Sequence, residues 1–368
     1  MRPTWVEIDL NALKSNFLRV KEVVGERVRV LSVIKADAYG HGAVRVGKTL
    51  VDAGTDMLGV ATLEEALELR ESGIGVPMFI LGGIHPDEAQ EVIKCNFIPA
   101  LFSLESASAL SEASRKLGKR AKYHLKLDTG MSRLGVGFDD ICNFLNELST
   151  LEGLEMQGVF THLADADGAS RDFTLRQIGL FREALELLRV AGFRALYVHT
   201  ANSAAIERFP ESHNNLVRPG IMLYGASGGI NINSGINSRL KPVMKFKTKI
   251  IQIKRLRKGT PVSYGGTFVT SGLTLIAVLP VGYADGYARS LSNRAEVALC
   301  GKRASVVGSV CMDLTVIDVT DVPGAKVGDE VVLFGDPGVL VEDVAGWANT
   351  ISYEVLSLIG NRVPRVYI

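Results

Sequence analysis

Reactive side chains stand at the ends of several hydrophobic, β-branched runs in the sequence. Four of them come at the end of such a run or within four residues after it: Lys35, His162, Ser203 and Arg218. Taken singly, each has an ordinary explanation, because a lysine at a strand end is usually a solvated flank and a lone histidine is usually structural. If the runs are parallel strands of a barrel, their carboxyl ends meet on one face. We therefore predict one site that contains all four side chains.

Lys35 has the most distinctive chemistry of the four. It ends the run VLSVIK (30–35) and is followed directly by ADAYGHG (36–42). A lysine held in an apolar barrel mouth is disfavoured as an ammonium ion, so a free amine becomes available as a nucleophile. This is the chemistry by which a lysine forms a Schiff base with a carbonyl compound.

A second lysine lies on an unusual strand, 121–128 (AKYHLKLD). Its polar and apolar residues alternate, so Lys126 shares one face with His124 and Asp128. If this face points into the barrel, Lys126 is a buried charge that needs an anionic partner or a chemical modification. If the face points outward to the helices, it needs neither. Beyond the strand, Arg133 lies in a glycine-flanked loop, where a guanidinium suits a carboxylate or a phenolic oxygen.

Two segments are suited to a phosphate group. In HTANSAA (199–205), Asn202 and Ser203 begin a predicted helix, and the free N–H groups at such an N-terminus bind phosphate. The segment RPGI (218–221) adds backbone amides, and the last units of βα-barrels often form phosphate sites.

The final third of the chain carries three glycine-rich polar segments. They are SYGGTF (263–268), PVGYADGY (280–287) and GSVCMD (308–313). Tyr264 in the first segment is either an acid–base group whose phenol is tuned by a neighbouring cation or an ordinary packing tyrosine. Tyr353, on the last predicted helix, is either a phosphate or substrate ligand or a core residue.

Residues 1–238 alternate between strand-like and helical segments, and this alternation must position the reactive residues. Eight short β-branched runs are separated by helical periodicity and glycine-rich turns. The runs are 30–35, 57–61, 77–81, 97–101, 121–128, 154–161, 196–199 and 216–218, and the clearest helices are 62–72, 104–117 and 170–191. Regular alternation indicates a parallel sheet, and eight units favour a closed barrel. The predicted fold class is therefore α/β, with an N-terminal (β/α)8 TIM-like barrel.

Residues 239–368 follow a different rhythm and predict a mostly β C-terminal domain. One helix is predicted at 341–359, and strand-like runs follow one another at 244–256, 274–280, 295–299, 303–307, 314–319 and 330–334. The change falls in the segment 225–238, which is rich in Gly, Ser and Asn. The sequence leaves open whether the first ten residues pack on the barrel or on this domain.

The composition excludes several classes of protein. Lys and Arg number 41 and Asp and Glu number 40, so the net charge is 41 − 40 = +1, which argues against binding to nucleic acids or anionic membranes. The four cysteines form no C-x-x-C pair, so no metal site is predicted. The N-terminus lacks an apolar signal core, and no run of about 18 apolar residues occurs. We therefore expect a cytoplasmic enzyme.

The same motifs resemble those of bacterial alanine racemases, which are pyridoxal 5'-phosphate (PLP) enzymes of fold type III. The likeness runs from TWVEIDL (4–10) to RVPRVYI (362–368), and VIKADAYGHG (33–42) is its most specific motif. The motifs that reinforce it occur in the family's order: DTGMSRLG, HTANSAA, RPGIMLYG, VSYGGTF, VGYADGY and CMD. Two departures, Asp37 in place of the commoner Asn and THLADAD (161–167), touch no reacting group.

The resemblance implies a role for each residue that does chemistry. Lys35 would carry PLP and act as the base on the D-face of the substrate. Tyr264 would be the base on the L-face, acting in the site of the other subunit, so a homodimer with shared active sites is implied. Arg218 would hydrogen-bond the pyridine nitrogen, and His162 would bond Arg218 in turn.

Further residues would hold the cofactor and the substrate. Arg133 would bind the phenolic oxygen of PLP and the substrate carboxylate, and Lys126 matches a position that is often an N-carboxylated lysine in the family. The PLP phosphate would be held by five residues: Tyr39, Ser203, Gly220, Ile221 and Tyr353. Met312 would line the substrate pocket from the partner, near Tyr283, Cys311 and Asp313. The implied activity interconverts L- and D-alanine and supplies D-alanine for peptidoglycan.

Other functions stay open from the residues alone. A related PLP-dependent amino-acid decarboxylase with the same two-domain build would use a partner cysteine, for which Cys311 is suited, although Arg218 and Tyr264 argue against it. A serine or broad-specificity racemase would share every residue named above. A non-catalytic PLP carrier would lack the C-terminal domain. A hydrolase that used Asp128 and Asp165 would leave Lys35 and Arg218 unexplained.

Overall fold

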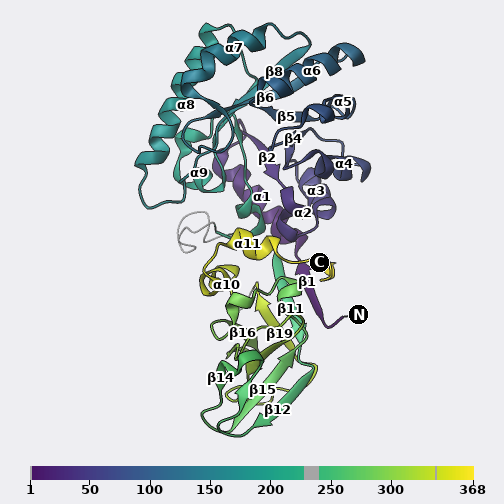
Figure 1. Ribbon diagram of the computed structural model, residues 1–368, viewed down its shortest axis with the longest axis vertical. Coiled ribbons are helices and arrows are strands. Elements are labelled where there is room, and N and C mark those ends of the chain that lie inside the picture. The colour runs from purple at the N-terminus through teal and green to yellow at the C-terminus, as the bar shows by residue number, and fades with distance from the viewer. Residues whose placement is uncertain (1, 228–239, 336–337) are drawn as a thin grey trace.

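The computed structural model of the chain describes residues 2–227, 240–335 and 338–368. Figure 1 shows a helix-covered barrel above a body made mostly of strands, and α2 (Lys35–Gly40) and α11 (Ser352–Ser357) lie where the two meet. The predicted domain boundary, between residues 238 and 239, lies outside the described residues.

Eight parallel strands form a nearly closed barrel. They pair in the order β10-β2-β3-β4-β5-β6-β8-β9, and the short β7 (Val136–Gly137) pairs with β6. The eight are β2 (Arg29–Val33), β3 (Met57–Val60), β4 (Met78–Ile80), β5 (Ile98–Leu101), β6 (Ala121–Asp128), β8 (Leu154–Phe160), β9 (Tyr197–His199) and β10 (Leu216–Val217). Backbone hydrogen bonds such as Arg218 N to Ala201 O, at 2.9 Å, link the two ends of this order. The predicted (β/α)8 barrel is confirmed.

Helices cover the outside of the barrel, and four of them, α1, α4, α6 and α9, begin at a side-chain cap. The Ser103 hydroxyl accepts a hydrogen bond from Ser106 N at 3.2 Å, which confirms the predicted start of α6. The covering helices are α1 (Leu10–Val24), α3 (Ala43–Asp52), α4 (Leu63–Glu71), α5 (Ala89–Lys94), α6 (Leu104–Leu117), α7 (Ile141–Ser149), α8 (Asp172–Val190) and α9 (Ser203–Arg208). None of the helices in the described residues has the length and hydropathy needed to cross a membrane.

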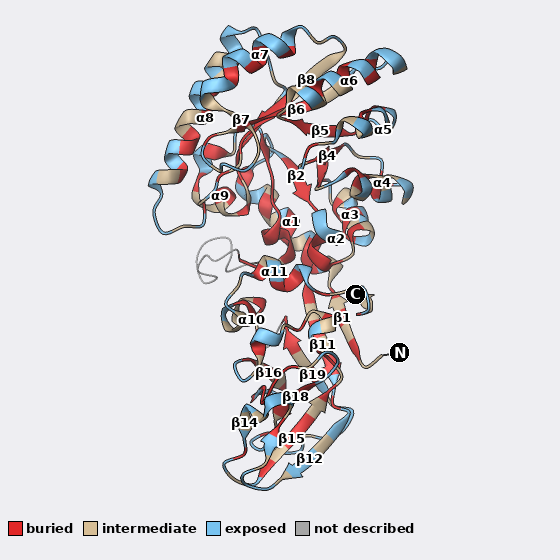
Figure 2. Ribbon diagram, in the orientation of Figure 1, coloured by how far each residue is buried: buried red, intermediate tan, exposed pale blue. Residues whose placement is uncertain are grey.

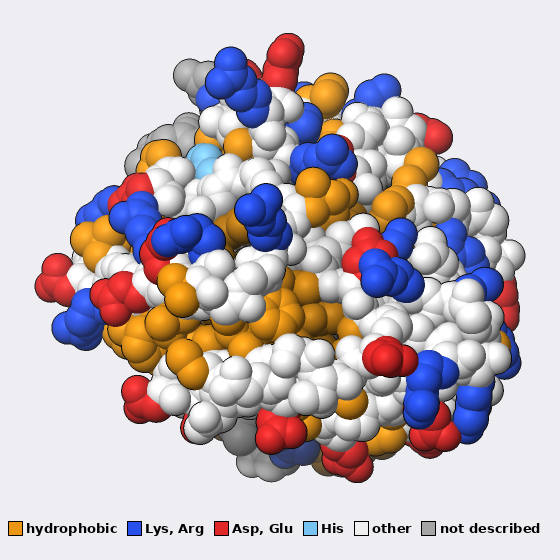
Figure 3. Space-filling model, turned by 90° about the horizontal axis from the view of Figure 1, so that it is seen from above, with side chains coloured by type: hydrophobic (Ala, Val, Ile, Leu, Met, Phe, Trp, Pro, Cys, Tyr) orange, Lys and Arg blue, Asp and Glu red, His pale blue; other side chains and the backbone are white. Residues whose placement is uncertain are grey.

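The barrel strands are buried on both faces, as parallel strands between helices and a filled interior must be. Every residue of β3, β4 and β5 is buried, and Figure 2 shows most of the barrel strands as buried, whereas the first part of β8 is intermediate. Seen from above, hydrophobic side chains gather in the middle of the upper surface of the molecule, and many charged side chains lie around them (Figure 3). Each fully buried Val, Leu, Ile or Phe contributes about 1.5–3 kcal/mol, so this core is a main source of stability.

The C-terminal body contains a six-stranded sheet, a three-stranded sheet and a two-stranded ribbon, which confirms the predicted mostly β domain. The orders are β17-β16-β19-β11-β1-β20, β12-β15-β18 and β13-β14. The strands are β11 (Met244–Lys249), β12 (Gln252–Leu256), β13 (Pro261–Val262), β14 (Phe268–Val269), β15 (Thr274–Leu279), β16 (Glu296–Leu299), β17 (Lys302–Ser305), β18 (Thr315–Asp318) and β19 (Glu330–Phe334).

Both ends of the chain complete the larger sheet. β1 (Thr4–Ile8) pairs antiparallel with β11 and parallel with β20 (Arg365–Tyr367). The first residues therefore belong to the sheet of the C-terminal body. The sequence predicts neither strand, because each is short and gains its partners only from distant parts of the chain.

Two long predicted elements are each divided in the structure, so both predictions were wrong. The run 244–256 changes sheets after β11: Ile250 N bonds Asp329 O, whereas Ile251 N bonds Val278 O, both at 3.0 Å. The helix 341–359 is α10 (Val341–Ala348) followed by α11, because Asn349 ends α10 in the left-handed region, at φ 57°. Hydrophobic periodicity does not register breaks of one to three residues.

Candidate active site

Lys35 lies on a backbone turn of left-handed sense at the barrel mouth. β2 ends at Val33, so the prediction that the strand reaches Lys35 was wrong by two residues. The next four residues, 36–39, have φ between 52° and 54°. This region costs a non-glycine residue roughly 1–2 kcal/mol, so the surrounding structure must enforce it.

His41 is one of the groups that enforce this turn. Its ring is fully buried, and Nδ1 lies 3.0 Å from Ala38 O and 2.9 Å from Tyr39 O. Burial lowers the pKa of His41 to about 4, so the ring is neutral and Nδ1 carries the proton that is donated to these carbonyls. Arg365 adds a hydrogen bond from Nε to Gly40 O at 3.2 Å. The C-terminal tail thus helps to hold the turn that follows Lys35.

The amine of Lys35 is easier to deprotonate than that of a free lysine. The side chain reaches solvent in a single chain, but the protein atoms around it lower its pKa by desolvation, and the charge of Arg133 lowers it further. Glu65 acts in the opposite direction. The net effect favours a nucleophilic amine.

The polar face of β6 points into the barrel. Lys126 is only 6% exposed and His124 is fully buried. The Lys126 ammonium lies 5.5 Å from the centroid of the Phe160 ring, and burial together with Arg133 and Arg218 lowers the pKa of Lys126 to about 8. The outward alternative is excluded, and the buried charge predicted for this face is present.

Arg218 is the buried centre of the polar cluster. It is 3% exposed, and its guanidinium donates to Thr161 O at 2.8 Å, to Thr200 O at 3.0 Å and to His199 Nδ1 at 2.9 Å. His162 Nδ1 lies 3.4 Å away. Burial lowers the pKa of Arg218 to about 9, so the group stays cationic at neutral pH.

His162 shows that the predicted cations converge. Burial lowers its pKa to about 3, and the further causes, in order, are the charges of four cations: Arg218, Arg133, Lys126 and Lys35. His162 is therefore neutral and can accept a hydrogen bond from Arg218. The structure thus brings together five predicted site residues on one barrel face.

The sequence did not predict that two further histidines, His199 and His124, lie in contact behind Arg218. Because Arg218 donates to His199 Nδ1, the proton of neutral His199 is on Nε2, and this Nε2 lies 2.9 Å from His124 Nδ1. His124 must then carry its own proton on Nε2, a buried atom that has no hydrogen-bond partner. His199 ends β9 just as His162 follows β8, so its place at a strand end was the available signal.

A small polar cradle lies beside this cluster. The Ser203 hydroxyl accepts a hydrogen bond from Gly220 N at 2.9 Å, and a Cβ atom on Gly220 would lie 2.6 Å from the Tyr39 hydroxyl, so a larger residue would displace this phenol. The rings of Tyr39 and Tyr353 have their centroids 5.9 Å apart. Burial raises the pKa of both phenols, that of Tyr353 to about 12, so each keeps its proton for donation. Ile221 is buried next to Gly220.

The remaining predicted site residues lie in the C-terminal body, away from Lys35. Tyr264 stands between β13 and β14, and Figure 1 shows β14 in the lower body while α2 lies at the junction. Tyr264 is 72% exposed, Met312 53% and Tyr283 40%. One chain therefore presents two separate groups of predicted site residues.

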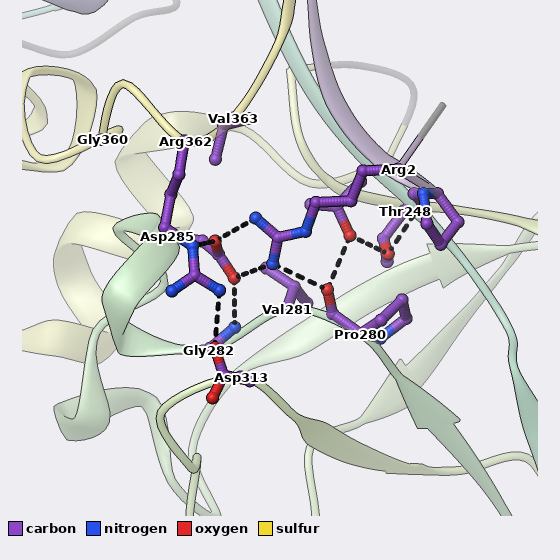
Figure 4. Close-up of polar contacts among 12 residues, drawn as sticks. Arg2, Thr248, Pro280, Val281, Gly282, Asp285, Asp313, Gly360, Arg362 and Val363 are labelled. Atoms are coloured by element: carbon purple, nitrogen blue, oxygen red, sulfur yellow. Dashed lines mark hydrogen bonds and ion pairs between the residues drawn. The ribbon is translucent and has the colours of Figure 1, made fainter.

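The two loops that carry Met312 and Tyr283 are bound to each other and to both chain ends. Tyr283 N donates to Cys311 O at 3.1 Å. Figure 4 shows the fully buried carboxylate of Asp285 between Arg2 and Arg362, with Arg2 Nη1 2.6 Å and Arg362 Nε 2.8 Å from Asp285 Oδ1. Arg362 also reaches Asp313, which follows Met312, at 2.5 Å. Within the described residues, no group of three His, Cys, Asp or Glu side chains could hold a metal ion.

This fold and site define a class of two-domain barrel proteins with a lysine of lowered pKa at the barrel mouth and a small polar cradle beside it. Residues 8–228 match the model of the alanine racemase N-terminal domain, and residues 243–367 match that of the alanine racemase C-terminal domain. The chain belongs to the alanine racemase family, whose activity is that of an isomerase. The resemblance seen in the sequence motifs is confirmed.

Individual relatives agree over the full length. The alanine racemase of Halothermothrix orenii is 44% identical, over 100% of this chain and 97% of its own. The solved alanine racemase of Clostridium difficile 630 is 39% identical with a TM-score of 0.92, covering 100% of this chain and 96% of its own. The Bartonella henselae alanine racemase with covalently bound pyridoxal phosphate is 30% identical with a TM-score of 0.91, and both chains are covered completely.

Proposed function

We propose that this chain interconverts L- and D-alanine with PLP held on Lys35, in a site that a second copy of the chain completes. The convergence of Lys35, Arg133 and Arg218 on one barrel face carries the proposal, because it joins an amine to two cations that suit anionic groups. A carbonyl cofactor supplies the electron sink for the Cα–H bond when it is bound.

The residues present fit PLP. The cradle offers a hydroxyl, two protonated phenols and backbone amides, which are neutral donors suited to a phosphate, and its residues are Tyr39, Ser203, Gly220, Ile221 and Tyr353. Arg218, held by His162 and His199, would meet the ring nitrogen. The Bartonella henselae racemase binds pyridoxal phosphate covalently, which supports the same role for this family member.

Alanine is the substrate that the relatives support. The Clostridium difficile racemase was solved in complex with cycloserine and the Bacillus anthracis enzyme with L-Ala-P. Arg133 would bind the substrate carboxylate, and Met312 would limit the space left for the side chain. Within a bacterial cytoplasm the product D-alanine would serve peptidoglycan synthesis.

Racemisation needs a proton removed from one face of Cα and another returned to the opposite face. The lowered pKa of Lys35 lets its amine accept a proton on the D-face. Tyr264 would serve the L-face through its hydroxyl. The two residues lie apart in one chain, and the highly exposed Tyr264 would therefore act in the site of a partner.

A homodimer follows from the same placement. Residues 1–238 would contribute the cofactor site of one protomer, and residues 239–368 would contribute Tyr264, Tyr283 and Met312 to the partner. The exposure of these three side chains in a single chain agrees with a surface that a second copy covers.

Lys126 would be carboxylated on its amine. Its pKa of about 8 leaves a fraction of free amine at neutral pH. That amine attacks carbon dioxide, an N–C bond forms and one proton is released to solvent, leaving a carbamate anion. The carbamate anion would face Arg133. Replacing the Lys126 ammonium by an anion removes the energetic cost of burying a cation beside three other cations.

Reconstitution with PLP tests the proposed function. The protein should show the visible absorbance of lysine-bound PLP and convert either enantiomer of alanine to the racemate, faster than it converts serine. Lys35→Ala should abolish both signals, and Lys122→Ala, at the other end of the inward face of β6, should retain them. Racemisation by Lys35→Ala would contradict the proposal, and release of carbon dioxide from an amino acid would indicate a decarboxylase instead.

A further inference from the structure

Tyr264 has few neighbours in its own chain that could orient it. Its side chain is 72% exposed and lies in the short helical turn η6 (Tyr264–Gly266). The direction of the phenol therefore depends on the backbone that carries it. The following inference rests on the proposed role of Tyr264 as the second base.

The residue before Tyr264 has a strained backbone. Ser263 has φ 61° and ψ −173°, a combination that is populated almost only by glycine. A serine stays there only when the surrounding contacts outweigh the strain, and such residues cluster at functional sites.

Two hydroxyl groups hold this peptide from both sides. The Ser263 hydroxyl donates to Ser309 O at 2.6 Å, and the Ser309 hydroxyl donates to Tyr264 O at 2.9 Å. Ser309 is buried, at 7% exposure, so its hydroxyl has lost water and depends on this bond. The two bonds form a closed ring between the turn of Tyr264 and the loop 308–311.

Close backbone contact locks the same pair of loops. A Cβ atom on Gly308 would lie 2.7 Å from Val262 O and 2.8 Å from the Cβ of Ser263, so the loops touch only because residue 308 is glycine. Gly308 N is held in turn by Asn293 Oδ1 at 2.6 Å. The loop 308–311 therefore serves as a fixed support for the turn.

We propose that Ser263 and Ser309 are positioning residues that direct the Tyr264 phenol toward the active site of the partner subunit. Ser263 holds the peptide in its strained form, and Ser309 fixes the carbonyl of Tyr264. Because Met312 follows on the same loop, the phenol of Tyr264 and the pocket-lining side chain of Met312 keep a constant separation.

Five variants of the PLP-loaded enzyme test the proposal. Ser263→Ala and Ser309→Ala should each lower the racemisation kcat by roughly 10–100-fold, the usual effect of a displacement near 1 Å. Ser309→Thr keeps the hydroxyl and should restore most of the rate. Ser263→Gly removes the strain with the hydroxyl and should stay within about threefold of the wild type. Ser111→Ala is the matched control, because Ser111 is equally buried and donates to Glu152 O at 2.7 Å, far from the site.

A second readout separates positioning from a general loss of structure. With α-deuterated D-alanine in water, removal of deuterium by Lys35 does not require Tyr264, whereas inversion does. The ratio of deuterium loss to inversion should rise about tenfold in Ser263→Ala and Ser309→Ala and stay unchanged in Ser111→Ala. The melting temperature of Ser263→Gly should equal or exceed that of Ser263→Ala, the reverse of the order at an unstrained position.

Unchanged ratios in both alanine variants would overturn the positioning role, as would a Ser263→Gly enzyme that is slower than Ser263→Ala. Tyr264→Phe distinguishes a failure of this inference from a failure of the proposed function. If Tyr264→Phe loses inversion while the serine variants behave like the wild type, only this inference fails. If Tyr264→Phe inverts alanine at the wild-type rate, the proposed function fails together with the inference.

Discussion

The buried, hydrogen-bonded pair His199 and His124 makes the stability of this protein sensitive to acid, and His124→Gln tests that reasoning. Burial lowers the pKa of His124 to about 3, with a smaller effect from Arg218. An unfolded histidine titrates near 6.5, so the unfolded chain takes up a proton at a pH where folded His124 does not. The stability contributed by neutral His124 is fully present above the pKa of histidine in the unfolded chain. It falls as the pH drops below that value and levels off below the pKa of His124 in the folded protein.

The magnitude follows from the two pKa values. Between pH 7 and pH 5, one such histidine removes about 2 kcal/mol of the free energy of unfolding. For a chain of 368 residues this corresponds to roughly 2–3 °C in Tm. A glutamine side chain is uncharged at both pH values, and its carbonyl oxygen can accept the hydrogen bond that His199 Nε2 donates to His124.

Calorimetry at the two pH values is the assay. The Tm of the wild type should fall more between pH 7 and pH 5 than that of His124→Gln, by about 2–3 °C. His85→Gln is the control, because His85 is exposed, and it should reproduce the wild-type difference. An identical loss of Tm in His124→Gln and wild type would refute the reasoning, because it would mean that folded His124 titrates as freely as unfolded His124.

Further expectations concern the charged centres. Arg218→Lys cannot reach all the acceptors of the guanidinium, so two unpaired buried acceptors should cost about 2–4 kcal/mol, measured by urea unfolding. Arg218→Glu should raise pyruvate formation relative to racemisation, because a carboxylate favours a protonated ring nitrogen; an unchanged product ratio counts against the role of Arg218. Removal of carbon dioxide should slow the wild type and bicarbonate restore it, whereas Lys126→Ala should respond to neither. Asp285→Ala removes the buried carboxylate that pairs with Arg2 and Arg362 and should lower the Tm, whereas Glu186→Ala, in an exposed pair, should leave the Tm nearly unchanged.

The barrel could be predicted because its strands are short, separate hydrophobic runs. Parallel strands buried on both faces, such as Leu58–Val60 in β3, contrast clearly with the helices between them. The order of the runs then requires that Lys35, His162, Ser203 and Arg218 meet on one face. The chemistry of that face could therefore be predicted from the sequence before any contact was known.

Other features could not be predicted because distant contacts decide them. β1 is a strand only because it pairs with β11 and β20, and β20 is a strand only because it pairs with β1. The change of sheet after Ile250 depends on the acceptors Asp329 O and Val278 O, and neither is near it in sequence. A local pattern contains no information about such partners.

The sequence by itself determined the barrel, the β-rich second domain and which reactive residues share the barrel mouth, because hydrophobic period and chain order are local properties. Only the tertiary structure decided that residues 36–39 form a left-handed turn, that His199 and His124 extend the contacts of Arg218, and that Ser263 is strained beneath Tyr264. The physical reason is the same in each case. A conformation that is unfavourable locally, or a polar group that is costly to bury, persists only when partners from elsewhere in the chain stabilise it, and folding alone brings those partners together.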